Sequence, residues 1–141
     1  MPSRFVHRQR VEFSETDMAG IVHYSRYFRY MEVAEHAFLR SLGTSVVGMD
    51  VAWPRVEVSC AYKAPLRFED EIDVELDVVE LKKRAITYGF TILRVAPGPR
   101  AVVATGRTTV VSVAMDPTTG AMRAVPMPAD FAAKLAPAAQ E

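Results

Sequence analysis

The sequence predicts an α+β domain in which a five-stranded antiparallel sheet packs against one long helix. Two observations predict this class. Apolar residues recur at helical spacing over a single segment, Tyr24 to Leu42, and alternate with polar residues in the segments that follow. The resulting order is one strand, the helix and then four strands. Because short turns join the later strands, we expect antiparallel pairing.

The N-terminal half supplies the first strand, a loop and the helix. Phe5 to Ser14 is rich in valine, phenylalanine and charge and is interpreted as a strand, whereas Glu15 to His23 contains the Asp, Gly and Thr typical of a loop. The helix is predicted from Tyr24 to Leu42, with Gly43 suited to its C-terminal end. Glu32 and Glu35 are expected to be solvated, or paired with Arg29 and His36.

Four strands are predicted in the second half. Their alternating apolar positions are Val56 to Tyr62, Ile72 to Val78, Ile86 to Ile92 and, in the longest strand, Ala101 to Met115. Gly106 is expected to mark a bulge, and the last strand to lie at an exposed edge that favours self-association. We expect a single domain over residues 1–141, with a short helix from Ala129 to Leu135 and a frayed tail over residues 136–141.

Composition excludes several classes of function. Seventeen basic residues balance seventeen acidic ones, so we expect no nucleic-acid partner. One cysteine, Cys60, excludes an intramolecular disulfide and a multi-cysteine zinc site, and histidine spacing predicts no metal. No stretch longer than nine residues lacks a charged side chain, so we expect no membrane span. Without a recognisable leader segment, the expected location is the cytoplasm.

The loop before the helix carries the strongest candidate chemistry. The first N–H groups of a helix have no partner within it, and the helix dipole adds partial positive charge there, so this end could polarise a carbonyl group. Asp17 precedes the helix closely enough to face the same point, and Gly20 permits an unusual backbone shape. A carboxylate beside an electrophile can be a nucleophile or a general base. Equally, Asp17 could only shape the turn, and His23 could only bond the helix start.

These residues resemble a known family. The signature resembles that of hotdog-fold acyl-CoA thioesterases of the 4-hydroxybenzoyl-CoA thioesterase family, which includes the Tol-Pal-associated thioesterases. Its residues are Glu15-Thr16-Asp17-x-x-Gly20-x-Val22-x-Tyr24-x-x-Tyr27, followed by Met31-Glu32-x-Ala34.

The resemblance implies a hotdog fold, an acyl-CoA substrate and no separate cofactor, since coenzyme A belongs to the substrate. It implies a homodimer or homotetramer with active sites between subunits. Asp17 would be the catalytic carboxylate, and the backbone N–H of Tyr24, with that of His23, would form the oxyanion hole. Lys82, Lys83 and Arg84 would receive the phosphates of coenzyme A.

Alternatives remain open. The chain could be a non-catalytic hotdog protein that binds acyl-CoA or a protein partner, or a hotdog dehydratase or hydratase that uses His23. Lys82, Lys83 and Arg84 could be a solvated turn that offsets the acidic strand before it. The sequence leaves undecided the acyl group, its carrier (CoA or an acyl carrier protein) and the role of Asp17 as nucleophile or base.

Overall fold

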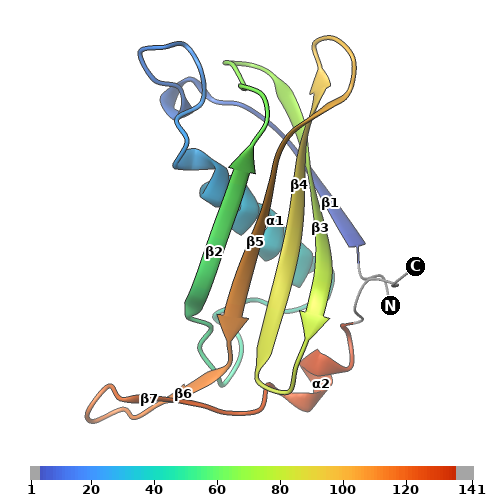
Figure 1. The fold of residues 1–141 in the computed structure, drawn as a ribbon. Coiled ribbons are helices and arrows are strands. Elements are labelled where there is room, and N and C mark those ends of the chain that lie inside the picture. The colour runs from blue at the N-terminus through green and yellow to red at the C-terminus, as the bar shows by residue number, and fades with distance from the viewer. Residues whose placement is uncertain (1–3, 136–141) are drawn as a thin grey trace.

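A computed structural model describes residues 4–135 of the chain. One long helix and five long strands make up most of it, with two short strands and a short helix near the C-terminus (Figure 1). The elements are β1 (Arg4–Arg10), the 3₁₀ turn η1 (Phe13–Glu15), α1 (Arg26–Ser41), β2 (Arg55–Tyr62), β3 (Glu71–Leu81), β4 (Ala85–Ala96), β5 (Ala101–Val111), β6 (Val113–Met115), β7 (Met122–Ala124) and α2 (Ala129–Ala132).

The five long strands form one antiparallel sheet in the order β1-β3-β4-β5-β2, which confirms the predicted class. The strand expected at the edge is wrongly placed: β5 ends at Val111 and lies inside the sheet, between β4 and β2. The edges are β1 and β2. Because β2 has a neighbour on one side only, its other side presents unpaired backbone groups.

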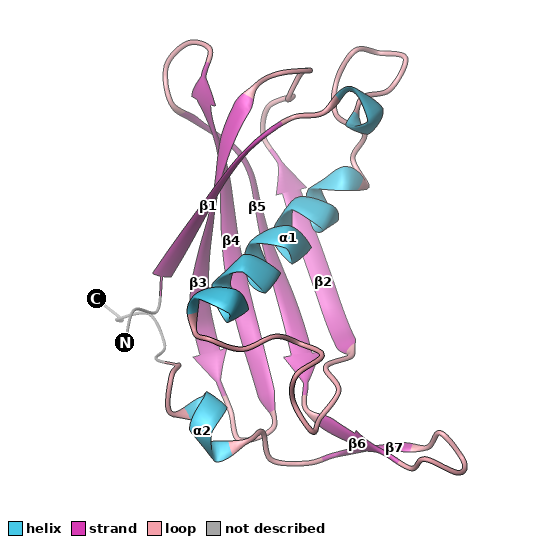
Figure 2. Cartoon of the chain, turned by 180° about the vertical axis from the view of Figure 1, so that it is seen from behind, coloured by secondary structure: helices cyan, strands magenta, loops and turns pink. Residues whose placement is uncertain are grey.

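Helix α1 crosses one face of the sheet and forms the core with it (Figure 2). The inward positions of β3 and β4 are buried and apolar, as the alternation predicts, and so is the helix face opposite them. These residues are Ile72, Val74, Leu76, Val78, Ile86, Tyr88, Phe90, Ile92, Tyr30, Met31, Ala34 and Phe38. The helix begins at Arg26, two residues later than predicted, because Tyr24 and Ser25 form a turn before it.

Gly106 does not mark a bulge. It pairs in regular register with Cys60 of β2 and Phe90 of β4, and the irregular step between β4 and β5 lies at Ile92 and Leu93. A Cβ atom at residue 106 would collide with the side chain of Met31 on α1. Glycine therefore allows the helix to approach the sheet closely at this point.

A second, two-stranded sheet of β6 and β7 was not predicted. It follows β5 directly, is joined to the chain before β2 by a bridge between Ala52 and Val113, and projects past the edge strand (Figure 1). The predicted turn from Asp116 to Gly120 connects its strands. Helix α2 starts at Ala129 as predicted but ends at Ala132, and the predicted frayed tail lies outside the described residues.

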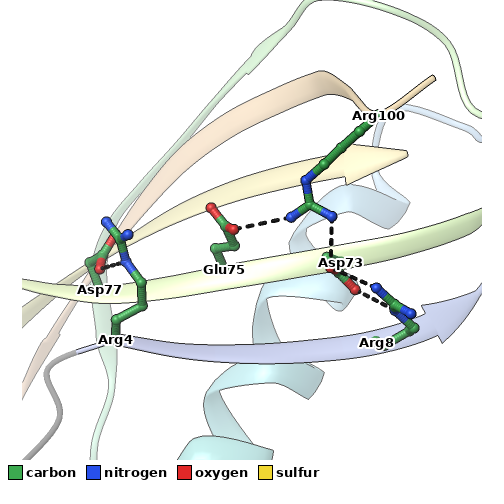
Figure 3. A network of polar contacts seen from close by, with 6 residues as sticks. All are labelled: Arg4, Arg8, Asp73, Glu75, Asp77 and Arg100. Atoms are coloured by element: carbon green, nitrogen blue, oxygen red, sulfur yellow. Dashed lines mark hydrogen bonds and ion pairs between the residues drawn. The ribbon is translucent and has the colours of Figure 1, made fainter. Parts of the chain in front are cut away.

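The acidic outer face of β3 is neutralised by arginines from neighbouring segments (Figure 3). Asp73 accepts hydrogen bonds from Arg8 of β1 at 2.7 Å and from Arg100, before β5, at 3.2 Å. Arg4 bonds Asp77 at 2.8 Å, four residues further along both strands. The hydrogen bond from Arg8, joined by that from Arg100, lowers the pKa of Asp73. These contacts fasten the edge strand β1 to β3.

Candidate active site

The loop between β1 and α1 is anchored to the helix by a buried carboxylate. Glu15, only 6% exposed, accepts a hydrogen bond from the hydroxyl of Tyr30 at 2.9 Å and another from the backbone N–H of Glu12 at 2.7 Å. The carbonyl of Glu15 accepts from the backbone N–H of His23 at 3.0 Å. Both ends of the loop are therefore held by one residue whose side chain reaches the core.

Asp17 lies at the exposed tip of this loop. Thr16 and Val22 form an isolated bridge that closes the tip, and the N–H of Asp17 donates to the carbonyl of Ile21 at 2.9 Å. Gly20 has a φ of 80°, a left-handed conformation that favours glycine, as expected from the sequence. The Asp17 carboxylate accepts the N–H of Ala19 at 2.8 Å, which orients it while leaving it open to solvent.

The helix start lies immediately after the bridge. The carbonyl of Tyr24 accepts a hydrogen bond from the hydroxyl of Tyr62 on β2 at 2.8 Å, whereas its N–H has no acceptor among the residues that the structure describes. Ser25 makes no side-chain cap. Of the two backbone N–H groups predicted for the oxyanion hole, that of Tyr24 thus remains a donor close to the positive end of α1. The expectation for His23 is wrong, because its N–H already bonds the carbonyl of Glu15.

His23 bonds the helix start. Its Nδ1 atom lies 2.8 Å from the hydroxyl oxygen of Ser25 and accepts the backbone N–H of Ser25 at 3.3 Å. The ring also packs at 4.5 Å against that of Tyr24.

The basic turn lies at the opposite end of the sheet from Asp17 (Figure 1). It follows β3, an eleven-residue strand that spans about 36 Å at ~3.3 Å per residue. Lys82, Lys83 and Arg84 are all exposed, and Lys82 pairs with Glu80 at 3.0 Å. The structure therefore brings Asp17, Gly20, His23 and Tyr24 onto one loop but does not bring the basic turn to them within a single chain.

A buried ion pair missed by the sequence analysis lies between α1 and β2. Glu35 is 3% exposed and bonds the guanidinium of Arg55 at 2.7 Å, so the expectation of a solvated or locally paired Glu35 is wrong. Burial raises the pKa of Glu35, and the charge of Arg55 opposes that shift. Its partner lies twenty residues away in the sequence, so helical spacing carried no signal for this contact.

Beside this pair, a groove of about 390 Å³ runs between the helix and the edge strand. Within residues 4–135, no three His, Cys, Asp or Glu side chains lie where they could share a metal ion. Over the same residues, no helix has the length and apolar character needed to cross a membrane.

The antiparallel sheet packed on one long helix and the similarity to thioesterases together define a thioester hydrolase of the hotdog fold. The chain belongs to the thioesterase-like superfamily, whose sequence model matches residues 11–135.

Similar proteins include one from Aquifex aeolicus, provisionally named an esterase, which is 39% identical over 93 residues, or 64% of this chain and 73% of that protein. The 4-hydroxybenzoyl-CoA thioesterase of Pseudomonas sp. is 25% identical over 97 residues, or 64% of this chain and 69% of that enzyme. A crystal structure of a hypothetical protein from Aquifex aeolicus superposes with a TM-score of 0.82 at 32% identity and covers 94% of this chain and 99% of its own.

Proposed function

We propose that this protein hydrolyses an acyl-CoA thioester to the free acid and coenzyme A, with Asp17 as the catalytic carboxylate. The observation that carries the proposal is the arrangement of the loop. It presents the exposed carboxylate of Asp17 just before an uncapped helix start, where the N–H of Tyr24 has no acceptor within residues 4–135. Hydrolysis of CoA thioesters by similar proteins, such as that of Pseudomonas sp., supports the choice of substrate.

The chemistry follows from this placement. The Tyr24 N–H and the helix dipole stabilise the negative charge that develops on the thioester oxygen. Asp17 either removes a proton from the attacking water or attacks the carbonyl carbon itself, forming an anhydride that water then cleaves. In both cases the C–S bond breaks, the sulfur leaves as coenzyme A after gaining a proton, and the oxygen of water ends in the acid.

His23 is a positioning residue in this proposal. Its bonds to Ser25 hold the turn that directs the Tyr24 N–H outward. We assign the His23 ring no contact with the substrate.

A second copy of the chain completes the site. We place the homodimer contact at β2, because that edge has unpaired backbone and the exposed apolar side chain of Val56. A two-fold axis through β2 reverses the strand direction and sets the Asp17 end of one sheet beside the opposite end of the partner sheet. The exposed turn Lys82 to Arg84 of one copy would then contact the phosphates of a CoA molecule whose thioester lies at Asp17 of the other.

The test compares wild-type protein with Asp17→Asn on a panel of aromatic and aliphatic CoA thioesters. The substitution keeps the shape and removes the charge, so kcat should fall by about a hundredfold or more, the scale of general-base catalysis. Asp50→Asn, which changes an exposed loop aspartate elsewhere, is the matched control and should retain full activity. Near-normal turnover in Asp17→Asn would remove Asp17 from the mechanism.

A further inference from the structure

Two side-chain contacts, one near each end of the edge strand β2, connect it to α1 and to the turn before that helix. At the end near the loop, the Tyr62 hydroxyl bonds the carbonyl of Tyr24 at 2.8 Å. At the other end, the Arg55 guanidinium bonds Glu35 at 2.7 Å, and a second nitrogen lies 3.9 Å from Glu32. Strand and helix therefore run side by side between a contact at the proposed oxyanion site and a contact at Arg55.

The groove between the two contacts has an apolar middle and a charged far end. Phe28 and Val58 supply apolar surface, and Thr108, which is 3% exposed, comes from the inward face of β5. The lining consists of Phe28, Arg29, Glu32, Arg55, Val58 and Thr108. Phe28 is the lining residue nearest to Tyr24 in the sequence, four residues beyond it, so this end of the groove lies toward the place where the thioester carbonyl would bind.

Arg55 is fixed at the far end of this groove. Its partner Glu35 is almost completely buried, and a buried charge holds its counterion firmly because separation would leave that charge unpaired. The guanidinium bridges from β2 to the helix instead of extending into solvent. A side chain held in this way presents a fixed barrier to a group that lies along the helix.

We propose that Arg55, held by Glu35, is the end-stop of the acyl groove and sets the longest acyl chain that the enzyme accommodates. This inference rests on the proposed function, since it takes the thioester to be bound at Tyr24. From Tyr24 to Glu35 the helix axis advances about 16 Å, at ~1.5 Å per residue. An acyl chain shorter than this gains contact with each added methylene, whereas a longer chain meets the guanidinium.

The test measures acyl-CoA binding in a background without turnover. In the Asp17→Asn parent, calorimetry gives the Kd of straight-chain ligands from butanoyl-CoA to hexadecanoyl-CoA, the longest of which exceeds the distance to Arg55. The first variant adds Arg55→Ala together with Glu35→Gln, so that no unpaired charge is buried. The matched control adds Arg55→Met with Glu35→Gln, which removes the same charges but keeps a long side chain. Thermal unfolding verifies that all three proteins fold.

In the parent, each methylene that fits should tighten binding about fourfold, and the gain should stop where the chain meets Arg55. The affinity of the alanine variant should continue to increase beyond that length, and it should bind the longest ligand at least tenfold more tightly than the parent. The methionine control should stop as the parent does.

Three outcomes overturn the end-stop. Identical length dependence in the parent and the alanine variant would show that Arg55 does not limit the chain. Uniformly weaker binding at every chain length would show that Arg55 supports the fold. If both variants accept longer chains equally, the charge of Arg55 and not its bulk limits the chain. Failure of every acyl-CoA to bind any of the proteins would instead overturn the proposed function itself.

Discussion

The hydroxyl of Tyr30, buried in the middle of α1, donates a hydrogen bond to the Glu15 carboxylate at 2.9 Å. Tyr30 is 0% exposed and Glu15 is 6% exposed, so this bond links the loop that carries Asp17 to the core of the protein. The exposed tip of the loop is thereby joined to a rigid element. Such support is expected of a site whose geometry must be held during a reaction.

Tyr30→Phe should destabilise the protein and loosen the loop. The substitution leaves Glu15 with a single donor, the N–H of Glu12, and hydrogen bonds to charged groups contribute about 1.5–3 kcal/mol. Denaturant unfolding should show a loss within that range, with a fall in kcat if the loop positions Asp17. Tyr24→Phe, which removes an exposed hydroxyl, is the control for stability. Equal stability of Tyr30→Phe and wild type would contradict a structural role for the bond.

The Asp73 cluster should make the protein sensitive to acid. Arg8 and Arg100 lower the folded-state pKa of Asp73 below its unfolded value of ~3.9. Their contribution is therefore complete at neutral pH and is lost as the pH falls through the lowered folded-state pKa. Asp73→Asn should reduce Tm at neutral pH and show a smaller acid-induced decrease than wild type. Parallel Tm profiles for the two proteins, measured by calorimetry from neutral to acid pH, would contradict the assignment.

Lys83→Ala should raise the KM for acyl-CoA several-fold and leave kcat unchanged, because phosphate contacts made equally in the ground and transition states affect binding alone. The effect should be largest at low ionic strength, since salt screens exposed charges. A short thioester without the nucleotide serves as the control substrate, and its KM should be the same for Lys83→Ala and wild type. If both substrates respond equally, the turn supports folding and the phosphates bind elsewhere.

Mixing a protein without turnover and a protein with weakened CoA binding should restore activity at low substrate concentration if each site draws on both subunits. Asp17→Asn keeps the basic turn, and the double variant Lys83→Ala, Arg84→Ala keeps Asp17, so a mixed dimer contains one intact site. Mixtures refolded together should hydrolyse acyl-CoA at low substrate concentration faster than either protein alone. Sedimentation should give at least a dimer for the wild type. A monomer at micromolar concentration, or no gain on mixing, would place the whole site within one chain.

Local patterns in the sequence determined the elements of this protein. The apolar face between Tyr24 and Leu42 predicted α1 to within two residues at its start, because helical periodicity depends only on neighbouring residues. The alternation from Ile72 to Val78 likewise predicted the buried face of β3. The loop with Asp17 and Gly20 was also found locally, since turn chemistry is encoded by the residues that make the turn.

Tertiary structure alone decided which elements are neighbours. The sequence placed the strand after Ala101 at an edge, but β5 is interior because β2 pairs with it across more than forty residues of chain. Glu35 has the spacing of a surface helix charge and is buried because packing brings Arg55 to it. Position 106 requires glycine because the side chain of Met31 on the helix lies where a Cβ atom would be. Each of these features depends on contacts between segments that are distant in the sequence. The free energy of such contacts cannot be inferred from a local pattern.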